Sequence, residues 1–263
     1  MAGVAGIVFV GAGNVASCLA DVINSGERKV QCVFSRTEQS ASALAGKLGC
    51  AYVTRMSDIP GAEIYITMLR DDALLSLAPD IVKANPDALF LHTSGSVPMT
   101  IWQKAGAAHY GVLYPLQTFS KGKKIDWQSV PFFVEASSDA DMTTIQQIAS
   151  SISSNVRILD SEQRSRMHLA AVFTCNFTNR MYAISELLLK ECGLPFSYFL
   201  PLVRETALKV SDASPGQVQT GPAVRGDSRV MQVHRQLLSN HPQWQELYDA
   251  ISADIMNSIR KDG

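Results

Sequence analysis

The feature that most constrains the fold is a run of small residues near the start of the chain, Gly11-Ala12-Gly13-Asn14-Val15-Ala16, directly after the apolar run 6–10. A buried strand leads into Gly11, where a tight turn needs a positive φ, and Gly13 lets backbone approach a pyrophosphate closely. Ala16 fills the third small position, where helix packs on strand. The helix that begins near Asn14 directs its unpaired N–H groups and positive dipole end at the anion. The pattern predicts a dinucleotide site at Gly11, Ala12, Gly13, Asn14 and Val15, in preference to an ordinary strand–helix turn.

Composition indicates a globular protein and excludes some partners. The chain has 263 residues, 46% of them hydrophobic, and a net charge of −1. This length suffices for one large or two medium domains, and the charge gives no bulk attraction to nucleic acid or to an anionic membrane. The basic stretch Lys121-Gly122-Lys123-Lys124 favours a solvated loop, with a phosphate site as the alternative.

The five cysteines are scattered, odd in number and without C-x-x-C spacing. They are typical of small buried side chains in a reducing compartment and predict neither disulfides nor a metal site. No signal peptide is expected ahead of the first strand, and no apolar run is long enough to cross a bilayer. We therefore expect a cytoplasmic protein without a membrane partner.

Strand and helix patterns alternate over the first part of the chain, which predicts a doubly wound, mostly parallel sheet of the Rossmann type. Helices are expected near 14–24, 38–48, 71–83 and 139–153. The expected strands span 6–10, 29–34, 51–53, 63–69, 88–92, 111–114, 131–135 and 156–159.

The strand pattern stops after Asp160, which predicts a Rossmann domain over 1–160 and an all-helical domain over 161–263. Gly193 is placed to cap a long helix, and a further helix runs from Pro195 to about Asp212. Pro222 and Pro242 occupy favoured first-turn positions of two more. The long helix around 167–189 is apolar nearly all round, so we expect it to be buried on most sides, with a homodimer through the helical domain supplying the cover.

The end of the second strand predicts which nucleotide binds. NAD-selective sites usually place a carboxylate there, which bonds the ribose hydroxyls. This chain has Ser35-Arg36-Thr37 instead. A guanidinium between two hydroxyls suits a phosphate dianion, so the cofactor is expected to be NADP.

Ligands in such sheets lie outside the carboxyl ends of the strands, and three segments end there. Residues 67–71 close the fourth strand, where Met68 and Leu69 would follow the cofactor. Residues 92–96 close the fifth, where Thr93 and Ser94 would contact cofactor or substrate. Residues 113–119 close the sixth. No G-x-S-x-G context supports a nucleophilic serine, and helix capping is the alternative for Ser96.

Two polar residues of the long helix are further candidates for catalysis. His168 and Asn176 lie about 12 Å apart along a helix axis, so both can line one cleft without touching. His168 is suited to protonate the oxygen or nitrogen of a group whose carbon receives hydride, or else is a histidine with its hydrogen bonds made within a packed helix. Asn176, polar among apolar neighbours, predicts a buried amide bonded to a cofactor or to a neighbouring helix.

Three segments carry a resemblance to a known family: residues 115–120 (PLQTFS), 170–176 (AAVFTCN) and 220–227 (TGPAVRGD). Over essentially its whole length the chain resembles Rossmann-like NADP oxidoreductases with a C-terminal all-helical domain of unknown function. More remotely it is similar to pyrroline-5-carboxylate reductase, prephenate dehydrogenase and the β-hydroxyacid dehydrogenases, whose helical domain is 6-phosphogluconate-dehydrogenase-like. The resemblance implies hydride transfer at C4 of the nicotinamide, dimerisation through the helical domain, and a substrate between the domains.

The chain departs from these relatives at two positions. Tyr114 stands where the close family commonly has His, so an acid at that position would be a phenol. Val172 stands four residues before Asn176, where β-hydroxyacid dehydrogenases place a catalytic Lys. The resemblance therefore favours reduction of an imine or ketone over lysine-assisted alcohol oxidation. Arg225 and Asp227 would either bind substrate or pair with each other.

The sequence thus predicts an NADP(H)-dependent oxidoreductase that transfers hydride to or from a small polar carbonyl or imine in the interdomain cleft. His168, Asn176 and Ser94 are the residues expected on the substrate side. A sensor or scaffold that binds NADP(H) without turnover is the alternative from another class. A dehydrogenase with a reduced deazaflavin as hydride partner is a further one.

Overall fold

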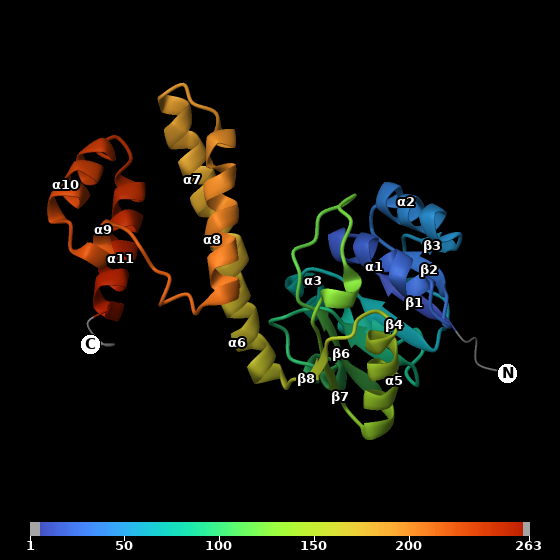
Figure 1. Ribbon diagram of the computed structural model, residues 1–263. Helices are drawn as coiled ribbons and strands as arrows, with labels where there is room; N and C mark the ends of the chain where they lie inside the picture. Colours follow the sequence, from blue (N-terminus) through green and yellow to red (C-terminus); the bar gives the residue numbers. More distant parts are fainter. Residues whose placement is uncertain (1–5, 260–263) are drawn as a thin grey trace. The chain divides into compact units, whose positions relative to one another are not determined.

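The computed structural model describes residues 6–259, and the first part of them forms a single sheet. Its strands are β1 (Ile7–Val10), β2 (Val30–Phe34), β3 (Ala51–Val53), β4 (Ile64–Thr67), β5 (Leu89–His92), β6 (His109–Pro115), β7 (Phe132–Ala136) and β8 (Val156–Ile158). The strand order is β3-β2-β1-β4-β5-β6-β7-β8, and neighbours run parallel except β6 and β7 (Figure 1). After β3 the chain returns past β1 to form β4. The two halves of the sheet therefore meet between β1 and β4, where doubly wound folds bind ligands.

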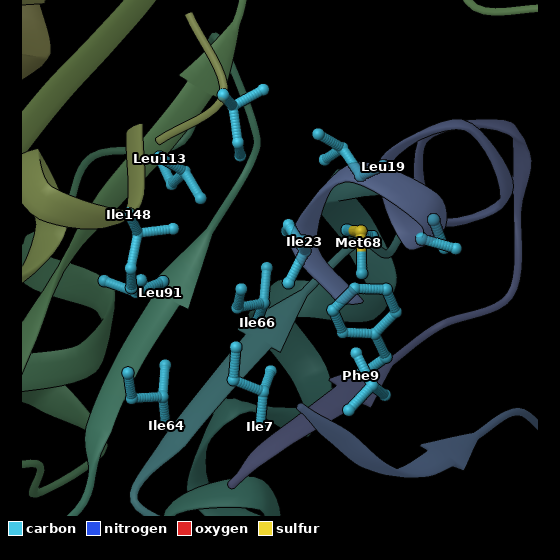
Figure 2. Close-up of a cluster of buried hydrophobic side chains, with 14 of the residues drawn as sticks. Ile7, Phe9, Leu19, Ile23, Ile64, Ile66, Met68, Leu91, Leu113 and Ile148 are labelled. Atoms are coloured by element: carbon cyan, nitrogen blue, oxygen red, sulfur yellow. The ribbon is translucent and has the colours of Figure 1, made fainter. Parts of the chain in front are cut away.

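Helices cover both faces of this sheet, because its strands alternate apolar side chains between the two faces. In β1, Ile7 and Phe9 pack on one face while Val8 and Val10 pack on the other. The first face is covered by α1 (Asn14–Asn24), α2 (Glu38–Leu48) and α5 (Asp139–Ser150), and the second by α3 (Asp71–Val82) and α4 (Thr100–Lys104). Figure 2 shows the first core, with Leu19 and Ile23 of α1 over the strand residues.

The remainder of the described chain is helical. Short 3-10 turns occupy Met56–Asp58, Trp127–Ser129 and Phe196–Phe199. The helical elements are α6 (Ser161–Ala171), a π-helical turn (Val172–Phe177), α7 (Thr178–Glu191), α8 (Leu200–Asp212), α9 (Pro222–Arg225), α10 (Ser228–Leu237) and α11 (Pro242–Ile259). This architecture confirms the predicted fold class, a mostly parallel doubly wound sheet followed by an all-helical region.

The chain divides into two compact units, one ending at Asn176 and the other beginning at Phe177. α6 packs with the first unit, although its sequence already lacks the strand pattern. The sequence assigns cofactor binding to residues 1–160, and substrate binding and dimerisation to residues 161–263. This assignment concerns function and stays a prediction. Residues 1–5, for which the sequence predicts no signal peptide, lie outside the described residues, as do the last four of the helical domain.

The long helix differs from its prediction in one respect. It runs on to Glu191 and is followed by Gly193 at φ +69°, as expected, but a π-helical turn interrupts it. A π-turn adds one residue to one turn, which changes which side chains share a face but leaves the apolar composition of the segment unchanged. Within one chain Leu169 is 59% and Phe173 62% exposed, so the expected burial of this helix by a second copy stays a prediction.

The cysteines are unpaired and differ in burial. All five cysteines are free; Cys32 is buried in β2 as expected, whereas Cys192 is exposed, contrary to the prediction of a buried thiol. Within residues 6–259, none of the helices is long and apolar enough to span a membrane.

Candidate active site

The turn after β1 has the geometry that a bound phosphate requires. Gly11 has φ +117°, and a Cβ there would lie 2.5 Å from the carbonyl oxygen of Met68. A Cβ at Gly13 would meet nothing within 4 Å, so the backbone there faces open space. Gly13 also precedes α1 without a side-chain cap, which leaves the first N–H groups of the helix available to an anion. Ala16 is fully buried between α1 and the sheet. At Gly11, Gly13 and Ala16, the space around the backbone therefore explains why the residue is small.

A cavity of about 610 Å³ opens beside this turn, and we call it the glycine-turn cavity. It brings together the ends of β1, β2 and β4, which are neighbours at the switch point of the sheet. Of the predicted cofactor residues, its lining includes Gly11, Ala12, Gly13, Asn14, Ser35, Arg36, Thr37, Met68 and Leu69. Val15, Thr93 and Ser94 do not line it.

The charge in the glycine-turn cavity is mostly positive. Arg36, Arg70 and Lys121 line it, against one carboxylate, Asp72. Among residues 6–259, Arg36 forms no ion pair, and Thr37 begins α2 without a side-chain cap. The cavity thus offers cationic and hydroxyl donors where a carboxylate would sit in an NAD site. These donors fit a nucleotide with an additional phosphate.

A second cavity, of about 640 Å³, also reaches the start of α1. We call it the Tyr114–His168 cavity. Asn14 lines both cavities, and Val15 lines this one. The remaining lining comes from the end of β6, the loop behind it, α6 and the π-helical turn: Tyr114, Leu116, Gln117, Thr118, Phe119, Met167, His168, Ala170, Ala171, Thr174, Cys175 and Asn176. His168 and Asn176 thus line one cavity, as their spacing predicts.

Tyr114 and His168 are in direct contact within this cavity. The Tyr114 hydroxyl lies 3.0 Å from Nδ1 of His168, and the two rings meet edge to face. Burial raises the pKa of the Tyr114 hydroxyl, while the positive charge of Arg164 opposes that rise. The phenol is therefore protonated at neutral pH and holds the imidazole in one orientation. A Cβ on Gly95 would lie 2.5 Å from His168 Nδ1, so a glycine makes room for the ring.

A buried ion pair fixes the helix that carries His168. Arg164, one turn earlier in α6, is 1% exposed and pairs with Glu135 of β7. Arg164 also donates to the carbonyl of Val97 at 2.7 Å, and Glu135 accepts from both the backbone and the hydroxyl of Ser161. Asp160 caps α6 through a capping box. These bonds tie the start of α6 to the sheet and so position the imidazole.

Ser94 is engaged within its own turn. Its hydroxyl donates to Asp71 at 2.8 Å and accepts from the backbone N–H of Ser96 and of Val97. The Ser96 hydroxyl also donates to Asp71. Ser94, rather than Ser96, therefore caps this turn, and it lines neither the glycine-turn nor the Tyr114–His168 cavity. Its assignment to substrate stays a prediction without a contact to support it.

Asn176 and the basic loop also differ from expectation. Asn176 is exposed within the chain, and its expected hydrogen bond to a cofactor or a neighbouring helix stays a prediction. Lys121, for which a solvated loop was favoured, lines the glycine-turn cavity, and Arg70 is a lining residue that sequence reasoning missed.

In the loop around residues 220–227, Arg225 pairs with Asp227 at 3.0 Å, which is one of the two alternatives that the sequence leaves open for these residues. Within residues 6–259 no cluster of His, Cys, Asp and Glu is arranged to hold a metal.

Comparisons with known proteins place this geometry in a family. Residues 130–255 match a family model described as a domain of unknown function, DUF2520. A crystal structure from Bacteroides fragilis, of a protein proposed to be an NADP oxidoreductase, is 47% identical over 96% of this chain and 98% of its own, with a TM-score of 0.91. The chain belongs to this family of NADP oxidoreductases. The predicted family is thereby confirmed.

More distant structures share the fold of this oxidoreductase. An imine reductase from Myxococcus stipitatus, in complex with NADP+, is 14% identical over 97% of this chain and 94% of its own, with a TM-score of 0.69. A reductive aminase from Aspergillus terreus, in complex with NADPH and ethyl levulinate, is 14% identical over 98% and 94%, with a TM-score of 0.68. Among curated proteins, none matches the sequence.

Proposed function

We propose that the protein uses NADPH to reduce a small polar carbonyl or imine in the Tyr114–His168 cavity. One observation carries the proposal: Asn14 lines both this cavity and the glycine-turn cavity. A dinucleotide with its pyrophosphate at Gly11 and Gly13 would therefore extend past Asn14 toward the only acid–base pair in the lining that the structure describes. The Bacteroides fragilis relative and the two complexes with NADP+ and NADPH support the choice of cofactor.

Residues of this chain would bind the cofactor as the sequence predicts. The N–H groups at the start of α1 would hold the pyrophosphate, and Ser35, Arg36 and Thr37 the 2′-phosphate. The loop behind β6 and the helix beyond it would enclose the substrate, where Gln117 and Asn176 offer amides to its polar groups. When bound, the nicotinamide supplies hydride to the substrate carbon.

His168 would supply the proton that accompanies hydride. With Nδ1 bonded to the Tyr114 oxygen, Nε2 is the nitrogen left for the substrate. The imidazolium of His168 gives its Nε2 proton to the substrate oxygen or nitrogen that gains the electron pair. The neutral imidazole that results stays hydrogen-bonded to Tyr114 through Nδ1. Tyr114 acts as a positioning residue in this step. The reverse reaction uses neutral His168 as the base.

A substrate screen with one variant tests this function. Wild-type protein is incubated with NADPH and keto acids, ketones with and without amines, or cyclic imines, and loss of NADPH absorbance is followed. We expect oxidation with at least one class, and a kcat lower by about 100-fold in His168→Asn, because general acids contribute on that scale. The Kd for NADPH should be unchanged in the variant.

The control is His109→Asn, because His109 is a half-exposed histidine of β6 that lines neither cavity. It should retain wild-type kcat. If folded wild-type protein binds NADPH tightly but oxidises it with none of these substrates, the reductase proposal is wrong. That result would favour a protein that senses NADP(H) without turnover.

A further inference from the structure

The loop between β6 and β7 is fixed against the start of α1. The side-chain amide of Asn14 donates to the carbonyl of Phe119 at 3.2 Å, and the Cys18 thiol donates to the carbonyl of Ser120 at 3.6 Å. The ring of Phe119 stacks on Trp127, at 5.9 Å between centroids. Trp127 in turn packs on the core of the sheet. The loop therefore has a defined path beside the glycine turn.

A tight turn at the tip of this loop presents one lysine. The backbone N–H of Lys123 donates to the carbonyl of Ser120 at 3.3 Å, and Gly122 has φ +78°. A positive φ at the third position is the mark of a type II turn, which needs glycine there. Lys121 occupies the second position of this turn, between the fixed carbonyl of Ser120 and the glycine.

Lys121 lines two neighbouring cavities. One is the glycine-turn cavity, and the other, of about 420 Å³, lies between α1 and α2. Both cavities also include Ser40, in the first turn of α2 just beyond Arg36. The second cavity contains another lysine, Lys47, but that ammonium pairs with Asp21 at 2.7 Å. Among residues 6–259, Lys121 forms no ion pair.

We propose that Lys121 is a second cationic ligand of the NADP(H) 2′-phosphate, acting with Arg36. The inference rests on the proposed cofactor. The ribose that carries this phosphate lies at the end of the second strand in such folds, and Ser40 places Lys121 on that side of the cavity. The pyrophosphate has the N–H groups of α1 as its partners, so Lys121 adds specificity for the additional phosphate.

Nucleotide binding without substrate tests the role of Lys121. The Kd values for NADPH and NADH are measured by fluorescence for wild type and for Lys121→Met, which keeps the aliphatic stem and removes the charge. Binding of adenosine 2′-phosphate and adenosine 5′-phosphate is measured by calorimetry. We expect Lys121→Met to weaken NADPH and adenosine 2′-phosphate about tenfold, the effect of losing one charge-assisted contact, and to leave NADH and adenosine 5′-phosphate unchanged.

Matched variants separate this role from general charge. Lys123→Met and Lys124→Met remove the same charge from the same loop at residues that line neither cavity, and they should leave all four Kd values unchanged. Arg36→Ala should weaken NADPH far more than NADH. If Lys121→Met loses equal affinity for NADPH and NADH, or loses affinity for neither, the inference is overturned. Failure of wild-type protein to bind NADPH would instead contradict the proposed function.

Discussion

His92, at the end of β5, shows how one buried residue makes stability depend on pH. The side chain is fully buried, and Nδ1 accepts the backbone N–H of Ser94 at 3.2 Å. Burial, and then the positive charge of Arg164, lower the pKa of His92 to about 3, against 6.5 when unfolded. The folded chain therefore holds His92 neutral over a range in which the unfolded chain binds a proton.

We expect this residue to destabilise the protein as the pH falls from about 6.5 toward 3, because only the unfolded state then gains a proton at His92. The free energy of unfolding, measured by urea denaturation, should fall by up to about 1.4 kcal/mol per pH unit more steeply in wild type than in His92→Gln. Above pH 7 the difference between the two proteins should be constant. Parallel pH profiles throughout the acid range would rule out His92 as the source.

Some site residues follow from local sequence and others do not. Gly11 and Gly13 could be predicted, because a turn between strand and helix restricts which residues fit there. Lys121 lies far along the chain from both, and only the packing of the β6–β7 loop on α1 brings it to the cavity. The same holds for the Arg164–Glu135 pair, because a charge pattern on α6 does not reveal a partner on β7.

The contact between α6 and the turn after β5 depends on a missing side chain. Gly95 is buried against His168, so we expect Gly95→Ala to push the imidazole from its place. Overpacking of this kind costs about 1–3 kcal/mol, measurable by urea denaturation, and kcat should fall with it.

The control is Gly46→Ala within α2, where a Cβ meets nothing within 4 Å. That variant should be more stable by up to about 1 kcal/mol. A Gly95→Ala protein as stable and active as wild type would show that the ring is not held by this contact.

Helices and strands were more predictable than the details within them. Hydrophobic alternation and the positions of Gly and Pro predicted the strands of the sheet and the helices α1, α2, α3 and α5 with small shifts at their ends, as with β6, which begins at His109 rather than Gly111. The π-helical turn escaped prediction, since its inserted residue changes which side chains share a face but not the apolar composition. Thr174, whose hydroxyl donates to the carbonyl of Ala170, lies within it.

At the scale of the whole molecule, exposed apolar side chains favour self-association. Leu202 and Leu208 of α8 are 60% and 62% exposed, and Leu169 and Phe173 of the long helix are exposed as well. We expect a homodimer by size-exclusion chromatography with light scattering, and a monomer for the double variant Leu202→Asp, Leu208→Asp, because charges at a buried interface are costly. Leu75→Asp is the control, as Leu75 is 56% exposed on α3 of the sheet unit. A wild-type monomer at micromolar concentration would contradict the prediction.

The order of the two cavities along the chain has a consequence for synthesis. Every lining residue of the glycine-turn cavity lies at or before Lys121, whereas the imidazole and the amide beyond it come from residues 161–176. A ribosome needs roughly 3 to 11 s to add the residues between Lys121 and Asn176. For that interval the nascent chain has the residues proposed to bind the nucleotide but lacks the histidine proposed to donate the proton.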